Sequence, residues 1–292
     1  MAVDADALDR WRRAGRISAR ARDLGSARVV AGASRRSVAE AIEAFIRSEG
    51  AEPAFPANLS RNDEAAHYTP DPDDRVTFEN GDVVKVDVGA HLDGYVADTA
   101  TTVEVGGTGR ATHLIRAVRD ALAAGIARVR SGVRVDEVSA AIESAIVAQG
   151  VKPVENLTGH SIERYRLHAG KSIPNVRGGP AAVLERGEVI AIEPFATNGA
   201  GAVENGPFGN IVRFRADPGP AAPELAPLFA RFRTLPFTAR WVADPSEREL
   251  VRRRRRFFQT YPVFIEAGRG TVAQAEHTVL VTDTGAELLT TP

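Results

Sequence analysis

The strongest structural constraint in this 292-residue sequence is a pair of alternating segments that meet at Asp93-Gly94. Apolar and polar residues alternate through VVKVDVGAHL before this dipeptide and through YVADTATTVEV after it. Alternation with a period of two is typical of a strand with one buried face, and Asp-Gly suits the tight turn of a β-hairpin. The sequence therefore predicts a long hairpin in which Asp87 lies opposite Ala100 and Asp98 lies opposite Gly89.

This register puts Asp87 and Asp98 on the same face of the hairpin. Diagonal neighbours in an antiparallel pair lie about 7 to 8 Å apart, so two buried carboxylates at these positions would repel each other. A bound cation would relieve that repulsion. An aspartate in a strand near a turn is more often an ordinary residue, so the pair alone does not establish a metal site.

Three further residues could join the two aspartates, because each lies in or beside an apolar or glycine-flanked stretch: His160, Glu193 and Glu276. Four carboxylates and one imidazole form an oxygen-rich ligand set that suits two divalent ions and differs from a structural zinc site. Two ions that share ligands can hold a hydroxide at neutral pH and polarise a carbonyl. The set favours metal-assisted hydrolysis, and manganese, iron, cobalt and zinc all accept such ligands.

Composition limits the other chemistries. The chain has no cysteine, which excludes disulfides, thiolate zinc sites and a cysteine nucleophile. Its 37 basic and 38 acidic residues nearly cancel, so a net charge of -1 gives no general reason to expect DNA or a membrane as a partner. The N-terminus lacks the pattern of a secretory signal, and no apolar run approaches the length of a membrane span. We therefore expect a cytoplasmic protein.

The rest of the chain mixes predicted helices and strands. Apolar residues at helical spacing predict helices over three ranges: 37–50, 110–130 and 135–150. Apolar runs predict strands around Glu193 and Glu276. Residues 51–74 contain His67, are rich in Pro, Asn and Asp, and are expected to form an ordered loop. This mixture predicts an α+β fold rather than a doubly wound parallel sheet.

Four segments resemble the metal motifs of the methionine aminopeptidase family: KVDVGAHLDGYVADTA, TGHSIERYRLHAG, VIAIEPFAT and TVAQAEHTVL. The resemblance implies that Asp98 and Glu276 bridge two divalent ions. It implies that Asp87 completes one ion's site, and that His160 and Glu193 complete the other.

The same resemblance implies two catalytic histidines that also bind the substrate. The segment NLSRNDEAAHYTP is similar to the family segment that places a histidine, here His67, near the scissile peptide. His168 resembles the histidine that hydrogen-bonds the substrate carbonyl. A histidine titrates near neutrality and can donate or accept a proton during the reaction.

The resemblance covers nearly the whole chain and implies a subtype. Glu193 and Glu276 are 83 residues apart, which resembles type II members, whose corresponding strands are joined through an inserted helical subdomain. Here that subdomain is expected at about residues 205–256. The absence of a long charged extension before the first helix resembles the archaeal form. Phe55 and Tyr261 fall where type II members line the methionine pocket, and an apolar slot suits a thioether.

The fold implied is a single pita-bread domain over residues 1–292, with a curved antiparallel sheet flanked by helices. The activity implied is removal of the initiator methionine from nascent proteins whose second residue is small, by attack of a hydroxide that two metal ions activate. The partners implied are the N-terminal peptides of nascent chains, and we expect a monomer. The run Arg252 to Arg256 could contact ribosomal RNA, although a solvated face balanced by Glu247 and Glu249 is the simpler interpretation.

Two other interpretations remain open. A proline-specific aminopeptidase would share the fold and the metal ligands, and a non-catalytic binding protein could use the same scaffold. Glu163 and residues 199–210 depart from the family pattern near the expected substrate entrance. Their effect on specificity is left open.

Overall fold

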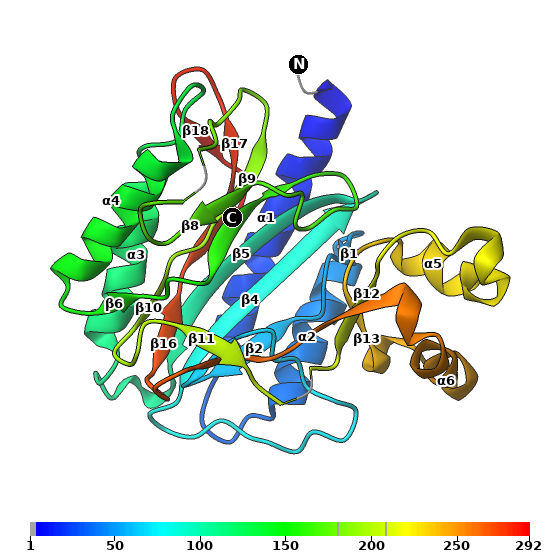
Figure 1. Ribbon diagram of the computed structural model, residues 1–292. Helices are drawn as coiled ribbons and strands as arrows, with labels where there is room; N and C mark the ends of the chain where they lie inside the picture. Colours follow the sequence, from blue (N-terminus) through cyan, green and yellow to red (C-terminus); the bar gives the residue numbers. More distant parts are fainter. Residues whose placement is uncertain (1–3, 180, 208) are drawn as a thin grey trace.

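The predicted hairpin lies at the centre of the computed structural model, which describes residues 4–179, 181–207 and 209–292 (Figure 1). Its strands are β4 (Val83–Leu92) and β5 (Tyr95–Glu104). The turn residues Asp93 and Gly94 have φ angles of 51° and 85°, as a two-residue turn of this kind requires. Asp87 pairs with Ala100 and Asp98 with Gly89, so the predicted register is confirmed.

Further strands extend the hairpin into a nine-stranded sheet. Its main path runs β1-β4-β5-β17-β9-β7-β8, with β2 paired to β4 and β18 paired to β17. The bounds of the added strands are β1 (Glu52–Pro53), β2 (Asn58–Arg61), β7 (Thr158–Ile162), β8 (Ser172–Pro174), β9 (Val189–Ile192), β17 (Glu276–Val281) and β18 (Ala286–Leu288). Every described pairing in this sheet is antiparallel, which confirms the α+β class.

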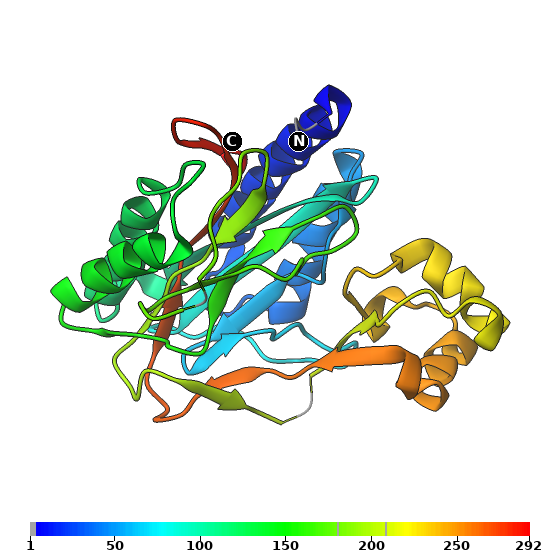
Figure 2. The same ribbon diagram turned by 45° about the horizontal axis from the view of Figure 1, so that its top comes forward.

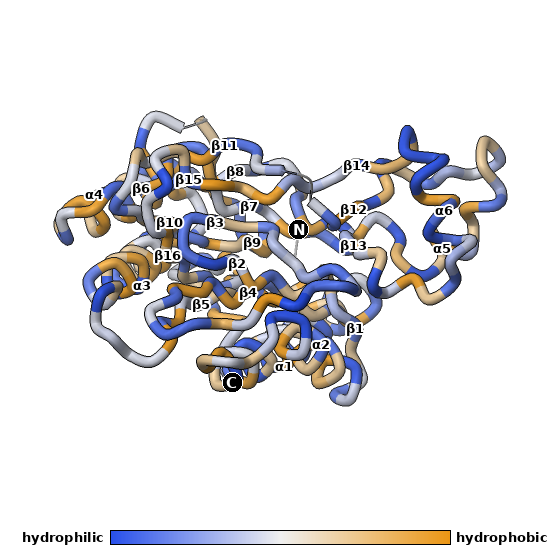
Figure 3. The backbone as a smooth tube through the Cα atoms, turned by 90° about the horizontal axis from the view of Figure 1, so that it is seen from below, coloured by the Kyte–Doolittle hydropathy of each residue, from blue (hydrophilic) through white to orange (hydrophobic). Residues whose placement is uncertain are grey.

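Two pairs of helices pack against one face of the sheet: α1 (Ala5–Arg28) with α2 (Arg35–Ser48), and α3 (Thr112–Ile126) with α4 (Val135–Ala148). Val84, Val86 and Val88 of β4 join the core of the first pair, and β9 and β17 contribute to the core of the second. The elements α3 and α4 and the strands beside them contain many hydrophobic residues (Figure 3). In the described part of the chain no helix has the length and apolar character needed to cross a bilayer.

The segment predicted as a loop, 51–74, contains three short strands: β1, β2 and β3 (Glu64–Ala66). The prediction missed them because Asn58, Leu59 and Ser60 are all buried, so the segment has no alternation of apolar and polar residues. Two further three-stranded sheets are separate from the nine-stranded sheet. One has the order β16 (Val272–Gln274), β10 (Phe195–Thr197), β6 (Lys152–Pro153), and the other β11 (Val203–Asn205), β15 (Phe264–Glu266), β3.

Residues 211–261 form a unit to one side of the sheet, which Figure 2 shows in yellow and orange. Its strands are β12 (Ile211–Phe214), β13 (Phe237–Thr238) and β14 (Phe258–Tyr261), and its helices are α5 (Ala226–Phe232) and α6 (Pro245–Arg253). Short 3₁₀ turns connect these elements. An aromatic core of its own, built around Phe214, Phe237 and Phe258, holds the unit together. It overlaps the predicted subdomain at 205–256 and contains strands as well as helices.

The hairpin turn provides a test of this packing. Gly94→Ala should destabilise the protein more than Gly32→Ala, although both glycines have positive φ, 85° and 83°. A Cβ on Gly94 would lie 2.4 Å from the Tyr165 ring, whereas a Cβ on Gly32 meets nothing within 4 Å. The backbone strain, about 1 kcal/mol, is common to both variants, and overpacking adds roughly 1 to 3 kcal/mol at Gly94. Denaturant unfolding measures the difference, and equal losses would contradict the packing described.

Candidate metal centre

The five residues predicted as metal ligands come from five strands that are neighbours in the sheet. Asp87 lies on β4, Asp98 on β5, Glu276 on β17 and His160 on β7, and Glu193 directly follows β9. All five line one cavity of about 230 Å³ on the sheet face opposite Val84, Val86 and Val88. These five residues, spread between positions 87 and 276, are therefore brought together by strand pairing and not by proximity in the sequence.

The distances within this group are short. Nε2 of His160 lies 3.8 Å from Oδ2 of Asp98 and 3.3 Å from Oε1 of Glu193. Asp98, His160 and Glu276 can each offer one ligand atom, and these atoms lie within 4.8 Å of one another. The three side chains are buried. The spacing allows one ion to contact several of them at once.

Burial raises the pKa of all four carboxyl groups. The pKa of Asp87 rises to about 7 through burial. Burial, followed by repulsion from neighbouring carboxylates, raises the pKa of Asp98, Glu193 and Glu276 well above their usual range. Among the described residues, no lysine or arginine forms an ion pair with any of the four. The negative charge of the centre is thus left without a counter-charge from the protein.

Oxygen atoms in this centre also lack hydrogen-bond donors. Oδ1 of Asp87, Oδ1 of Asp98 and Oε1 of Glu276 are buried without a partner in the described structure. Buried acceptors without donors are rare in folded proteins and call for an explanation. Burial lowers the pKa of His160 to about 4, so its imidazole is neutral and available as a ligand. This donor set fits divalent cations.

Gln274 belongs to the centre and was not predicted from the sequence. Its Nε2 donates to Oδ2 of Asp87 at 3.5 Å and to Oε2 of Glu276 at 3.3 Å. Its backbone is held by Thr102, whose hydroxyl donates to the Gln274 carbonyl and accepts from the Gln274 N–H. The alternation in TVAQAEH places residues 274 and 276 on one face, and this signal could have revealed the contact.

His67 and His168 face the same cavity. The ring of His168 lies 4.4 Å from that of His160. The ring of Tyr261 lies 5.3 Å from that of His67 and 6.0 Å from that of His168. Burial lowers the pKa of His67 to about 4. His168 is exposed toward the cavity mouth, but desolvation by surrounding protein atoms, followed by His160, lowers its pKa well below the usual value. Both rings are therefore neutral near pH 7.

Phe55 and Tyr261, the residues predicted for a methionine pocket, also line the cavity. The Phe55 ring packs directly on Gly89, because a Cβ at that position would lie 2.5 Å from the ring. The remaining apolar wall consists of Ala66, Leu157, Leu167, Phe195, Ile211, Pro236 and Phe264. The cavity thus joins an anionic floor to an apolar wall.

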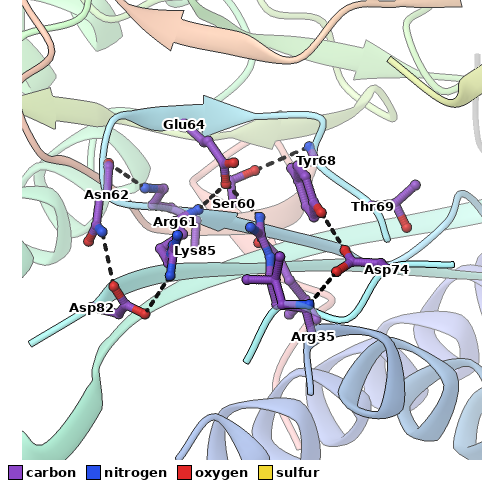
Figure 4. A network of polar contacts seen from close by, with 12 residues as sticks. Arg35, Ser60, Arg61, Asn62, Glu64, Tyr68, Thr69, Asp74, Asp82 and Lys85 are labelled. Atoms are coloured by element: carbon purple, nitrogen blue, oxygen red, sulfur yellow. Dashed lines mark hydrogen bonds and ion pairs between the residues drawn. The ribbon is translucent and has the colours of Figure 1, made fainter. Parts of the chain in front are cut away.

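A buried polar network holds the β2–β3 hairpin that precedes His67 (Figure 4). Nζ of Lys85 donates to the carbonyl of Asn62 in the hairpin turn at 2.8 Å. Glu64 accepts hydrogen bonds from the Arg35 guanidinium and from the Arg61 N–H. His67 directly follows β3 and has an unusual φ of 66°. Such a backbone conformation in a residue other than glycine persists only where the surrounding structure holds it.

A second buried contact joins the unit 211–261 to helix α2. The carboxylate of Glu43 on α2 accepts two hydrogen bonds from the Arg240 guanidinium, at 2.6 and 2.8 Å, and one from Nε1 of Trp241 at 2.8 Å. It also accepts the N–H of Ala57 at 3.2 Å, while Arg240 donates to the carbonyl of Pro70 at 3.1 Å. One ion pair therefore positions this unit relative to the segments that carry Phe55 and His67.

Two other histidines, and the positions that depart from the family pattern, lie outside the centre. His277 points to the opposite face of β17, where its ring contacts Thr290, and His91 accepts a hydrogen bond from the N–H of Gly94. Glu163 is exposed and pairs with Arg166. Of residues 199–210, Val203–Asn205 form β11 beside β15, and Phe208 lies outside the described residues.

Comparisons with known proteins place the chain in a class. The model of metallopeptidase family M24 matches residues 9–283, so the chain belongs to this family. Within it, the chain is 41% identical over 295 residues to a methionine aminopeptidase of Archaeoglobus fulgidus, covering 99% of this chain and 100% of that protein. The chain accordingly belongs to the archaeal methionine aminopeptidases of the family, which are metalloenzymes that hydrolyse peptides.

Solved structures agree in fold. A methionine aminopeptidase of Thermotoga maritima matches with a TM-score of 0.75 at 24% identity, covering 99% of this chain and 98% of that one. A thermophilic Arx1 matches with a TM-score of 0.85 at 19% identity, covering 100% of this chain and 92% of that one. These likenesses concern the fold alone, and with the family match they confirm the predicted pita-bread architecture.

Removing metal should make the stability of the protein depend on pH. Asp87 has a folded pKa of about 7 against a usual value of 3.8, so the fold binds this proton more tightly than the unfolded chain. Stability is therefore retained below about pH 4 and lost as the pH rises toward 7. We expect the Tm of metal-free protein to fall by at least about 2 °C, roughly 1 kcal/mol, between pH 5.5 and 8.

Divalent ions should stabilise most at the higher pH, because they bind deprotonated ligands. Calorimetry with and without metal at both pH values measures this effect. Asp87→Asn is the control and should reduce the slope of the metal-free protein. A metal-free Tm that stays level or rises over this interval would contradict the account of the centre.

Proposed function

We propose that this chain removes the N-terminal methionine from polypeptides whose second residue is small. The observation that carries the proposal is the group of four carboxylates, wholly or largely buried, and His160 at the floor of an apolar cavity. Identity of 41% over nearly the full length to a methionine aminopeptidase supports the choice of substrate. Phe55 and Tyr261 supply the wall against which a thioether side chain packs.

In the proposed centre four carboxylates and one imidazole would hold two divalent ions. Asp98 and Glu276 would contact both ions, Asp87 would complete one site, and His160 with Glu193 would complete the other. When bound, such ions supply hydroxide at neutral pH and polarise the carbonyl of the scissile peptide. Gln274 orients the carboxylates of Asp87 and Glu276 through its two hydrogen bonds.

The two histidines have separate roles: His67 transfers a proton, and His168 hydrogen-bonds the substrate carbonyl. Nδ1 of His67 lies 3.2 Å from the carbonyl of Pro262, so this nitrogen carries the hydrogen and Nε2 is left as the basic atom. We assign His67 to proton transfer at the scissile nitrogen. His168, beside His160, donates to the substrate carbonyl, where a hydrogen bond gains strength as negative charge develops.

Partners and location follow from this activity. The substrates are the N-terminal peptides of nascent chains, and the place of action is the cytoplasm, where those chains emerge. We propose that the enzyme works as a monomer, because one chain supplies every group assigned above. Within the run Arg252 to Arg256, ion pairs to Glu249 and Glu224 favour a solvated face. Contact with the ribosome stays a prediction.

Replacement of the shared ligands tests the centre. Asp98→Ala and Glu276→Ala should each abolish methionine release and lower the bound metal, because loss of a bridging carboxylate leaves the others in unrelieved repulsion. His277→Ala is the matched control on β17, since its side chain faces away from the cavity, and it should keep the metal content of the parent. Metal analysis by mass spectrometry decides the matter. Full activity with unchanged metal in either carboxylate variant would remove the proposed centre.

Substrate choice separates this function from that of a proline-specific aminopeptidase. The crowding of His67, His160 and His168 leaves room only for a small second side chain. Met-Ala, Met-Gly, Met-Ser and Met-Pro peptides should be cleaved, and Met-Lys, Met-Leu and Met-Phe should be cleaved at least about 100-fold more slowly. Release of free amino acid from such a panel is the measurement. Cleavage confined to Xaa-Pro bonds would overturn the methionine assignment, and no cleavage of any peptide by metal-loaded protein would favour a binding protein.

A further inference from the structure

A second cavity opens beside the metal centre. Its volume is about 380 Å³, and it shares three lining residues with the first cavity: Leu167, His168 and Tyr261. The others come from the loop after β7 and from the unit 211–261. Three of them are arginines, Arg166, Arg213 and Arg215. A polypeptide whose first residue occupies the metal cavity has to continue past this shared wall or leave through another opening.

The charges in the second cavity are unbalanced. Glu163 pairs with Arg166 at 2.7 Å and compensates that cation. Arg213 donates to Gln259 and to the carbonyl of Phe214, and Arg215 donates to the carbonyl of Phe258, so the acceptors of both are neutral. In the part of the chain that the structure describes, neither Arg213 nor Arg215 forms an ion pair. Two cations thus line a cavity that shares a wall with the metal cavity.

Arg213 is also close to the groups that would hold the substrate. Its charge acts on both His168 and Tyr261, the residues that separate the two cavities. An extended chain advances about 3.3 Å per residue, so a substrate that follows this route brings the residues after its first two toward the second cavity. The metal cavity is anionic at its floor, whereas the second cavity is cationic. The first therefore attracts the positively charged N-terminus of a substrate, and the second attracts negative charge further along the substrate chain.

We propose that the cavity lined by Arg166, Arg213 and Arg215 binds the third and fourth residues of the substrate polypeptide and favours acidic side chains there. This inference rests on the proposed function. Arg213 is partly buried, whereas Arg166 and Arg215 are exposed. A guanidinium that is partly shielded from solvent forms a stronger charge-assisted hydrogen bond with a carboxylate than a fully solvated one does. Glu163, which departs from the family pattern, limits the preference by neutralising one of the three cations.

The test compares three C-terminally amidated peptides that all begin with Met-Ala and differ only at positions three and four: Asp-Asp, Ser-Ser or Lys-Lys. Amidation removes the terminal carboxylate, which would otherwise compete for the arginines. For the metal-loaded parent enzyme, kcat/KM should be about 10-fold higher for Asp-Asp than for Lys-Lys, mainly through KM, and the ratio should shrink at high salt.

Variants decide whether the arginines cause the preference. Arg213→Gln combined with Arg215→Gln should bring the Asp-Asp to Lys-Lys ratio to within about 2-fold, and Arg215→Glu should reverse it. Arg255→Gln, an exposed arginine of the same unit without an ion pair in the described structure, is the matched control and should keep the parent ratio. Circular dichroism establishes that each variant is folded.

Three results would overturn the inference while leaving the proposed function intact: equal parent rates on all three peptides, a preference for Lys-Lys, or an acidic preference that survives both arginine variants. Failure to release methionine from any of the peptides would instead overturn the proposed function, and the inference with it. The Ser-Ser peptide separates these cases, because its cleavage depends on the metal centre without the charged side chains.

Discussion

Mutual repulsion among four carboxylates that are wholly or largely buried is the constraint on which the rest of this structure depends. Asp87, Asp98, Glu193 and Glu276 share one cavity, and no described lysine or arginine pairs with them. Burial without a counter-charge is costly unless a cation supplies it. The sheet therefore has two unlike faces. One packs in the usual way against the four long helices, and the other carries charge that the folded chain alone does not balance.

The sheet turns distant sequence positions into one centre by means of short-range rules. The positive φ values at Asp93 and Gly94 define the register of β4 and β5, and this register places two carboxylates side by side. β17 then pairs with both β5 and β9, which brings the C-terminal Glu276 between ligands from the two halves of the chain. A register shift of one residue in any of these pairs would send a ligand to the helical face.

Local patterns were sufficient to predict the hairpin, its register and the helices α2, α3 and α4, because each depends on residues close in the sequence. The ligand set came from a family resemblance, and the structure brings its members together without testing their roles. Strand β2 escaped prediction because both of its faces are buried. Gln274 escaped although strand alternation places it on the same face as Glu276, which it contacts. The contact of Glu43 with Arg240 escaped because it joins remote elements, and pairing over that separation leaves no periodic signal.

The Glu43–Arg240 pair also limits how this architecture can change over evolutionary time. Glu43 is almost wholly enclosed, and besides the N–H of Ala57 its partners are Arg240 and Trp241 of the unit 211–261. Substitution of Arg240 alone would leave this carboxylate enclosed without its ion-pair partner, at a cost of roughly 3 to 5 kcal/mol. Glu43 and Arg240 are therefore constrained to change together, and a neutral residue at one position is expected to be accompanied by a neutral residue at the other.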